Sequence, residues 1–311
     1  MMQLFRGISE DKLVKGCCLA LGNFDGVHRG HRRLIKNVVQ KARGKGRPAV
    51  VITFAPHPVQ VLEARSPGLL TSIKRKAELI AALGVDYLFI IPFTKELAAL
   101  EPETFVRSIL WSHFQPQLVA VGFNFTFGCR GSGSPALLQK LGKELGYELE
   151  VMAPVTYKGV TVSSTVIRNA LEQGDIELAR TLLGYWPLLE GRVVAGDQRG
   201  RQLGFPTANL AIPAEMKLPA CGVYACLARI QGGQVWEAMV NIGRHPTFTT
   251  ALSTKVEAHL IDFKGDLYGQ EMELELRAFL RPEHKFNSSK ELIAKLVEDK
   301  NKTRLLLAGH N

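Results

Sequence analysis

Two histidines, three residues apart, end the glycine-rich run Gly-Asn-Phe-Asp-Gly-Val-His-Arg-Gly-His, which extends from Gly22 to His31. Glycines let a backbone approach a phosphate closely, and the start of a helix offers free N–H groups at the positive end of its dipole. His28 and His31 can each donate a hydrogen bond to phosphate oxygens. The run therefore predicts a site that binds a nucleoside triphosphate and stabilises charge developing on its α-phosphate. The alternative is an ordinary helix cap with two surface histidines.

Three further segments of the first half contain groups that suit a nucleotide site. His57 and Pro58 belong to a proline-stiffened loop that follows an apolar run. Asn124 stands among three phenylalanines whose flat rings suit a flavin, although core packing is the better explanation for any single one of them. The third segment contains Ser163, Ser164, Thr165 and Arg168. Its hydroxyls, the N–H groups of a helix start and the guanidinium would form an anion-binding cradle, or the segment is simply a good helix N-cap.

The elements that must position these groups alternate between apolar strands and periodic helices. This order predicts a Rossmann-like parallel sheet with helices on both faces, and ligands then bind at the carboxyl ends of the strands. The expected strands are 17–21, 49–54, 87–92, 118–122 and 147–152, and the expected helices are 31–45, 72–83, 104–111 and 134–145.

Near residue 187 the pattern of the sequence changes from alternating strands and helices to successive strands, so we predict two domains, 1–186 and 187–311. Strand-like runs separated by Gly, Pro and Asp turns predict a small antiparallel β-barrel. These runs are 189–194, 222–230, 235–242, 256–263 and 271–280. A terminal helix is expected over residues 288–307, with Leu292, Ile293, Leu296 and Val297 on one face.

Chemistry in the second half is expected at a segment rich in Gly, Arg and small polar groups, Gly191 to Leu210. Its backbone N–H groups can wrap phosphates, and its hydroxyl and amide oxygens can bind Mg²⁺. The candidates are Gly196, Gly204, Pro206, Thr207 and Asn209, with Thr207 and Asn209 as metal ligands. Glu257 lies in an apolar strand and is either solvent-facing or a base for a hydroxyl that attacks a γ-phosphate.

The charge of the chain is +10, and eight of its 39 basic residues lie between His28 and Leu62, a stretch without an acidic residue. This excess predicts a positive field for polyanionic substrates; RNA or DNA contact and a solvated helix face are the rival interpretations. The sequence has no apolar run of the roughly 20 residues that span a bilayer, and its five cysteines have no metal-like spacing. We expect a cytoplasmic protein with reduced thiols and no membrane or nucleic-acid partner.

The decapeptide and the Ser-Ser-Thr-x-Ile-Arg segment resemble the two phosphate-binding signatures of the nucleotidyltransferase superfamily, in its flavin adenine dinucleotide (FAD) synthetase branch. The second half resembles a riboflavin kinase module, which includes Gly222-Val223-Tyr224, Leu267-Tyr268-Gly269 and Leu280-Arg281-Pro282. Nearly the whole chain is thus similar to bacterial bifunctional riboflavin kinase/FAD synthetases. Ala195, Cys129 and the pair Arg244-His245 depart from the family pattern without removing a proposed catalytic group.

The resemblance implies two reactions that use ATP and Mg²⁺. In the first half, flavin mononucleotide (FMN) would attack the α-phosphorus of ATP directly and give FAD and pyrophosphate. His28 and His31 would stabilise the transition state, and Arg168 would hold the leaving pyrophosphate with Ser164 and Thr165. The other residues expected to bind ligand there are Gly22, Asn23, Phe24, Asp25, Gly26, His57, Pro58, Asn124 and Ser163.

In the second half, the resemblance makes Glu257 the base that activates the riboflavin 5′-hydroxyl, while Thr207 and Asn209 bind Mg–ATP. Two alternatives remain open at this point. The first half could transfer a nucleotidyl group to a different phosphate, or the chain could be a flavin-sensing RNA-binding protein. A monomer or a weak homo-oligomer is expected in each case.

Overall fold

The computed structural model describes residues 1–8, 14–196, 200, 203–230, 233–246 and 252–308. The chain divides into two compact units, Met1–Ser164 and Thr165–Asn311. In the predicted segment Gly191 to Leu210, residues 197–199 and 201–202 lie outside the described part.

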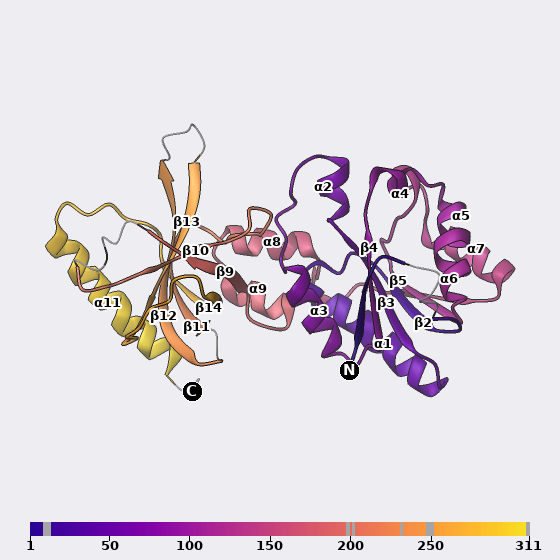
Figure 1. The fold of residues 1–311 in the computed structure, drawn as a ribbon, viewed down its shortest axis with the longest axis horizontal. Helices are drawn as coiled ribbons and strands as arrows, with labels where there is room; N and C mark the ends of the chain where they lie inside the picture. The colour runs from indigo at the N-terminus through magenta and orange to yellow at the C-terminus, as the bar shows by residue number, and fades with distance from the viewer. Residues whose placement is uncertain (9–13, 197–199, 201–202, 231–232, 247–251, 309–311) are drawn as a thin grey trace. The chain divides into compact units, whose positions relative to one another are not determined.

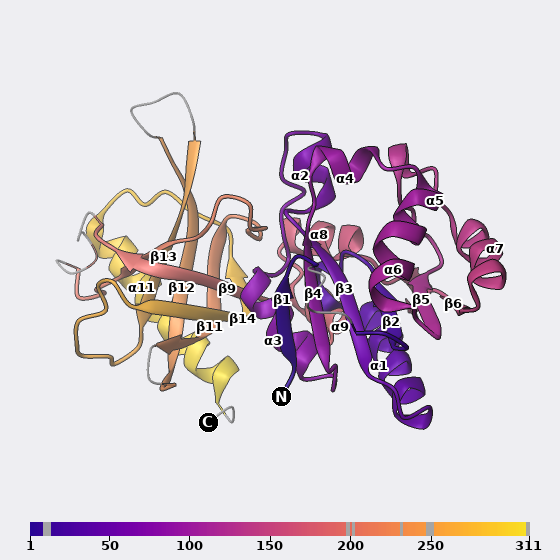
Figure 2. The same ribbon diagram turned by 45° about the vertical axis from the view of Figure 1, so that its right-hand side comes forward.

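The first unit contains a six-stranded sheet in which all the paired strands are parallel, as predicted. In spatial order its strands are β1 (Gln3–Arg6), β4 (Tyr87–Pro92), β3 (Ala49–Ala55), β2 (Cys18–Leu21), β5 (Leu118–Gly122) and β6 (Glu148–Met152). Strand β1 was not expected, because its four side chains are mostly exposed and show no apolar pattern. It pairs with β4 at one edge of the sheet (Figure 2).

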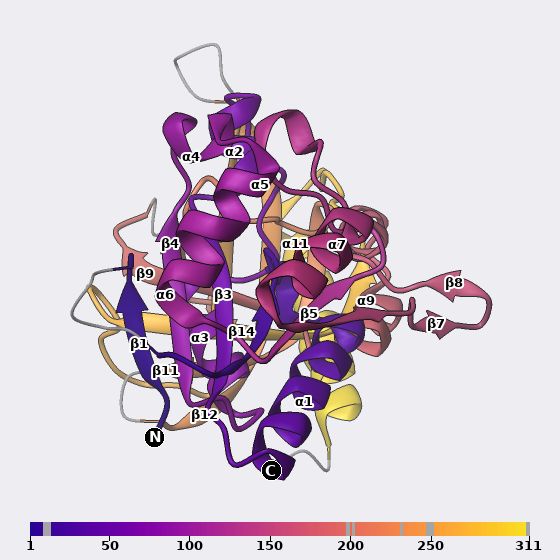
Figure 3. The same cartoon turned by 90° about the vertical axis from the view of Figure 1, so that its right-hand side faces the viewer.

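Helices follow most of these strands. They are α1 (Arg29–Gly44), α2 (Pro58–Leu62), α3 (Ile73–Ala81), α4 (Lys95–Ala99), α5 (Pro102–Phe105), η2 (Val106–Trp111), α6 (Ser112–Phe114) and α7 (Pro135–Leu145). Ser72 and Ser134 cap α3 and α7 through their hydroxyls. The helix predicted over 104–111 is a short α-helical turn followed by the π-helical segment η2. A two-stranded hairpin, β7 (Thr156–Tyr157) and β8 (Val160–Thr161), extends away from the sheet (Figure 3).

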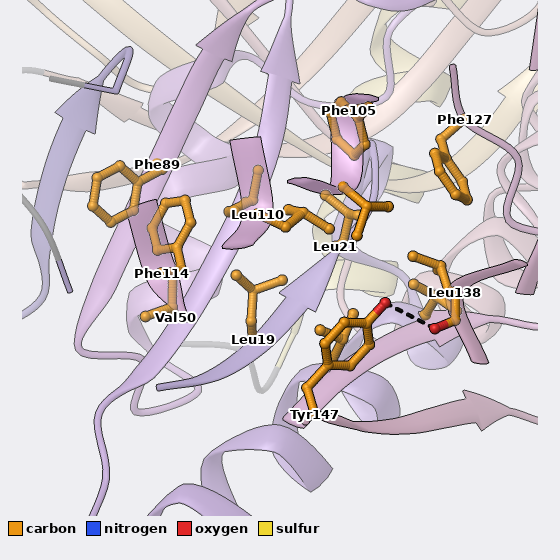
Figure 4. Packing of buried hydrophobic residues seen from close by; sticks show 14 of the residues in the cluster. Leu19, Leu21, Val50, Phe89, Phe105, Leu110, Phe114, Phe127, Leu138 and Tyr147 are labelled. Carbon is orange, nitrogen blue, oxygen red and sulfur yellow. Dashed lines mark hydrogen bonds between the residues drawn. The ribbon is translucent and has the colours of Figure 1, made fainter. Parts of the chain in front are cut away.

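The main core lies between one face of the sheet and the segment α5–η2–α6 together with α7. Leu19, Leu21 and Val50 contribute the strand side, and Leu110 and Phe114 contribute the helical side (Figure 4). Strand side chains alternate between faces, so the intervening buried residues face the other layer, where α1 packs on β2, β3 and β5. The strands are therefore buried on both faces, which is typical of a parallel sheet.

The strand order places a topological switch beside β2. The chain leaves β2 toward β3 on one side, while β5 pairs with the other side of β2. Ligand sites of open α/β sheets lie at the carboxyl ends of strands at such a switch point. The decapeptide follows β2 directly, so the fold puts it at this position.

The second unit is built on a closed barrel whose neighbouring strands are all antiparallel, as predicted (Figure 1). Around the barrel the strands are β10 (Ala208–Ala211), β13 (Leu252–Leu260), β12 (Val235–Pro246), β11 (Gly222–Ile230), β14 (Glu271–Arg281) and β9 (Leu188–Val194). Strand β10 was not expected, because it lies at the end of the glycine-rich segment. Helices α8 (Ser164–Glu172) and α9 (Ile176–Leu183) precede the barrel in the chain.

The terminal helix α11 (Ser289–Leu307) is capped by the Ser288 hydroxyl and contacts β11, β12 and β14 (Figure 1). Its fully buried residues are Asp299, Thr303 and Leu307. The predicted apolar face was therefore wrong in part: Leu292, Ile293 and Leu296 are only half-buried, and Val297 is exposed. The buried Asp299 carboxylate accepts a hydrogen bond of 2.9 Å from the Arg281 guanidinium, and this ion pair anchors the helix to the last strand.

Candidate functional site

The decapeptide forms a tight turn between β2 and α1 and is mostly buried. Phe24, the N-cap of the short helix η1 (Asp25–Val27), and Val27, its last residue, adopt positive φ angles of 47° and 35°. Gly26 inside η1 has φ 79°. The Phe24 ring is 2% exposed and meets the His31 ring edge to face at 5.2 Å. Backbone strain in two non-glycine residues persists only where the surroundings enforce it, and such strain is typical of functional turns.

His28 and His31 are in contact at the start of α1. His28 is the N-cap: its Nδ1 accepts a hydrogen bond of 3.3 Å from the backbone N–H of His31. The two rings stack with their centroids 3.5 Å apart. Because Nδ1 accepts, the proton of a neutral His28 lies on Nε2, which becomes the donor toward a ligand. Within the described part of the chain, the buried Nδ1 of His31 makes no hydrogen bond.

Burial lowers the pKa of His31 well below its ordinary value, and the nearby charges of His28 and Lys76 lower it further. At neutral pH His31 is therefore uncharged, and it acts on a phosphate as a neutral donor or acceptor. His259 in the second unit also has a lowered pKa, for which burial is the main cause.

These two shifts predict a loss of stability in acid. The unfolded chain takes up protons on its imidazoles as the pH falls below about 6.5, while the folded chain does not. We expect the thermal unfolding midpoint to decrease from about pH 7.5 to about pH 5.5, and to decrease less in His31→Gln. Differential scanning calorimetry over this range tests the prediction; an identical pH dependence in the variant would contradict it.

The decapeptide is fixed by hydrogen bonds from segments far away in the chain. The Asp25 carboxylate accepts a bond of 3.0 Å from the Leu70 N–H, and the Thr71 hydroxyl accepts one of 3.2 Å from the Gly26 N–H. The Ser164 hydroxyl donates to the Asp25 carbonyl at 3.0 Å. The Asp25 side chain therefore positions the loop, and Ser164 of the second predicted signature does lie against the first.

Lys76 was missed by the sequence analysis. This α3 side chain is only 8% exposed, and its Nζ donates to the Asn23 carbonyl at 2.8 Å. Burial lowers its pKa, and Asp25 opposes this shift. The only signal in the sequence is that Lys76 falls on the apolar face of a predicted helix. A lysine in a helix is ordinarily expected to reach solvent, and only the tertiary structure shows the contact of this one with the decapeptide.

His57 and Asn124 follow β3 and β5, so both lie at the same sheet edge as the decapeptide. His57 caps α2, its Nδ1 accepting from the Val59 N–H at 3.3 Å. Pro58 is the first residue of that helix. Asn124 is exposed.

The three phenylalanines around Asn124 lie in different environments. Phe127 is 7% exposed and belongs to the core, where its ring contacts that of Phe105. Phe125 stacks on Phe127 with their centroids 5.7 Å apart. Phe123, 47% exposed, is the ring of the three that a ligand can stack on.

Helix α8 begins at Ser164, directly after Ser163, so the predicted hydroxyls do stand at a helix start. Thr165 is exposed in its first turn, and Arg168 lies one turn further along the helix and is half-buried. The local structure thus brings the hydroxyls, a helix start and a guanidinium close together along the chain, as an anion cradle needs.

In the barrel, three polar residues form a row across adjacent strands. Glu257 of β13 pairs in register with Asn209 of β10 on one side and with Asn241 of β12 on the other. Directly opposite side chains of antiparallel strands share a face, about 5 Å apart at Cβ. The row thus brings the predicted base beside the predicted ligand Asn209, and Asn241 is a further polar neighbour that the sequence analysis did not single out.

Two glycines, Gly196 and Gly200, lie close to the predicted ligands Asn209 and Thr207. A Cβ on Gly196 would lie 1.9 Å from the Asn209 amide nitrogen. A Cβ on Gly200 would lie 2.3 Å from the Phe205 carbonyl oxygen and 3.4 Å from the Thr207 hydroxyl. The backbone of the glycine-rich segment therefore lies against Asn209 and Thr207, where a longer side chain has no room. Gly204 has a positive φ of 80° in the following turn.

Gly196→Ala is expected to displace the Asn209 amide and reduce any phosphoryl transfer at this site by about tenfold or more. Chemistry at the decapeptide should not change. Initial rates of both reactions, compared with Gly44→Ala in an open position of α1, measure the effect. A Gly196→Ala protein with full activity at both sites would show that Asn209 does not contribute.

A hollow of about 500 Å³ adjoins Thr207 and Pro206 and is also lined by the segment 265–268. His259, which is 8% exposed, lies beside this rim: it donates from Nδ1 to the Pro206 carbonyl at 2.8 Å and meets the Phe205 ring edge to face. His259 thereby fixes the turn that presents Thr207, a role that the sequence analysis missed.

The donor groups of the barrel fit Mg²⁺ better than a transition metal. No group of three or more His, Cys, Asp or Glu side chains among the described residues could hold a metal ion. A hydroxyl and an amide oxygen, at Thr207 and Asn209, are hard ligands, and Mg²⁺ commonly takes few protein ligands and completes its shell with water and substrate phosphates.

Comparisons with known proteins agree with the division of the chain into two units. The FAD synthetase family model matches residues 10–166, and the riboflavin kinase family model matches residues 183–307. The chain is 37% identical over 301 residues to an Escherichia coli K12 protein named bifunctional riboflavin kinase/FMN adenylyltransferase, with 96% of each chain covered. Proteins of the same name from Listeria monocytogenes and Bacillus subtilis are 38% and 36% identical, covering 93% and 91% of this chain and 92% and 90% of theirs.

Among solved structures, a Streptococcus pneumoniae protein titled macrolide-efflux protein matches with a TM-score of 0.87 and 29% identity, over 97% of this chain and 98% of that one. None of the helices formed by the described residues is both long and apolar enough to cross a membrane. Two family models in tandem, and relatives of one name that align almost end to end, settle the assignment: the chain belongs to the family of bifunctional riboflavin kinase/FMN adenylyltransferases.

Proposed function

We propose that this chain phosphorylates riboflavin to FMN in its barrel unit and adenylylates FMN to FAD at the decapeptide. The observation that carries the proposal is that each unit has a separate loop-built site of its own. One has the stacked His28–His31 pair at a helix start. The other has Asn209 in register with Glu257.

For adenylyl transfer, the phosphate of FMN attacks the α-phosphorus of ATP in line, and pyrophosphate leaves. Nε2 of His28 donates a hydrogen bond to the phosphate oxygens, and neutral His31 stacks on His28 and orients it. The unpaired Nδ1 of His31 gains a partner when ligand enters. Preorganised donors of this kind stabilise the charge that grows in the transition state. Ser164, Thr165 and Arg168 bind the departing pyrophosphate.

For phosphoryl transfer, Glu257 accepts the proton of the riboflavin 5′-hydroxyl as the hydroxyl oxygen attacks the γ-phosphorus of a second ATP. The bond from the γ-phosphorus to the bridging oxygen breaks, and ADP leaves. Glu257 lies between Asn209 and Asn241 in the strand row, so its carboxylate is held among polar neighbours. Thr207 and Asn209 would hold the Mg²⁺ that accompanies ATP, and this ion would offset phosphate charge when bound. The hollow beside Thr207 is large enough for a small organic ligand.

The test is a product assay on the purified full-length protein with Mg–ATP. Riboflavin should give FMN and then FAD, and FMN alone should give FAD with an equal amount of pyrophosphate, each separated by chromatography. FMN without FAD would favour nucleotidyl transfer to a different phosphate. The absence of both FMN and FAD, in a protein that binds RNA, would favour a flavin-sensing RNA-binding protein.

We also propose that the protein is cytoplasmic and acts as a monomer or a weak homo-oligomer on small-molecule substrates. Free thiols suit a reducing compartment, and all five cysteines are free. Analytical ultracentrifugation of the full chain measures the oligomeric state.

A further inference from the structure

A basic hollow of about 600 Å³ lies in the first unit, between helix α1 and the edge strand β6. Neither proposed reaction uses its lining. Four cations and two amides from α1 line it, together with Glu150 and Met152 from β6; the α1 residues are Arg29, Arg32, Arg33, Lys36, Asn37 and Gln40.

The cations of α1 fall into two classes. Those in its second half are neutralised: Lys41 pairs with Glu150 at 3.0 Å, Arg43 with Asp86 at 2.7 Å, and Lys45 with Glu148 at 3.0 Å. The four that line the hollow have no acidic partner in the described part of the chain. Glu150, the one acid in the lining, is already bound to Lys41.

This arrangement leaves four like charges concentrated without compensation. From Arg29 to Lys36 the helix rises only about 10 Å, so the charges repel one another. A multiply charged anion in the hollow would remove this repulsion and gain charge-assisted hydrogen bonds from three guanidinium groups, which suit phosphate oxygens. The Asn37 and Gln40 amides add neutral donors.

The extent of the unneutralised charge indicates the size of the ligand. A nucleic acid needs a positive track that continues along its backbone. Here the track ends after two helical turns, where Lys41, Arg43 and Lys45 are paired with acids. A cavity of this volume instead matches a small molecule.

We propose that this hollow is an anion site for a compact oligophosphate: free pyrophosphate or the phosphate tail of a nucleotide. It is distinct from the transition-state contacts of His28, although it begins at the next residue, Arg29.

Calorimetric titration of the full-length protein with inorganic pyrophosphate tests the site. The background is His28→Ala with His31→Ala and Arg168→Gln, which removes the charged and imidazole groups proposed to bind phosphate in the reaction site. We expect pyrophosphate still to bind, and Arg33→Gln with Lys36→Gln to weaken that binding by about tenfold or more. The matched control, Arg43→Gln with Lys45→Gln, also removes one arginine and one lysine charge, but their partners Asp86 and Glu148 lie outside the lining. This control should weaken binding by less than about twofold.

Competition distinguishes the two sources of phosphate. Displacement by tripolyphosphate but not by ATP would identify a site for free oligophosphate, and displacement by both would identify a site that accepts nucleotides. The proposal is overturned if pyrophosphate does not bind the background protein. It is overturned equally if Arg33→Gln with Lys36→Gln weakens binding no more than the matched control does. It is also overturned if a single-stranded RNA binds more tightly than pyrophosphate and loses binding in Arg33→Gln with Lys36→Gln. Circular dichroism confirms folding, since these side chains are on the surface.

Discussion

Replacement of both His28 and His31 by alanine is expected to abolish the conversion of FMN to FAD while riboflavin phosphorylation continues at the wild-type rate. The two rings stack at the start of α1, and the Nδ1 contact between His28 and the His31 N–H fixes the donor nitrogen. Loss of one preorganised donor to a developing oxyanion costs about 10²–10³ in rate, so loss of the pair should leave little activity. Separate assays with FMN and with riboflavin as the starting flavin measure both steps.

His113→Ala is the matched control for this prediction. It also replaces a histidine by alanine, but in α6, where the His113 Nδ1 lies 3.3 Å from the Ile109 carbonyl oxygen of the preceding segment η2. It should keep both activities. The assignment would be wrong if the double variant formed FAD at the normal rate, or if it lost both steps while remaining folded.

The second large effect is expected for Glu257→Gln: riboflavin phosphorylation should fall by about 10²–10⁴, the usual contribution of a general base. The substitution keeps the shape of the side chain in the row with Asn209 and Asn241 but removes the proton acceptor. FAD formation from supplied FMN should be unchanged.

Glu271→Gln serves as the control, because Glu271 is an exposed strand carboxylate in the same barrel. Full kinase activity in Glu257→Gln would remove Glu257 from the reaction. A mixture of Glu257→Gln protein with the double histidine variant should restore FAD formation from riboflavin, because FMN made by one protein can diffuse to the other. Failure of this mixture would contradict two separate sites.

Several features of the fold were predictable because they depend on local patterns. Apolar runs and helical periodicity predicted the sheet strands 87–92 and 118–122 with the bounds that the structure has. Helical periodicity predicted the helices 72–83 and 134–145, within which α3 and α7 lie. The decapeptide, as a continuous motif between a strand and a helix, indicated both its own turn and the chemistry of its histidines.

Other features depend on which segments meet in space, and no local pattern records that. The contact of Lys76 with the Asn23 carbonyl, the support of Pro206 by His259 and the row that aligns Asn241 with Glu257 all join residues from separate elements. Which of the three rings around Asn124 belong to the core was also not set by the local pattern, and packing on Phe105 places Phe127 there. The sequence by itself determined the family, the order of the elements and the reactive groups. Tertiary packing decided which groups are buried, which are paired and which charges on α1 stay unneutralised, because burial and pairing are properties of neighbours that lie far apart along the chain.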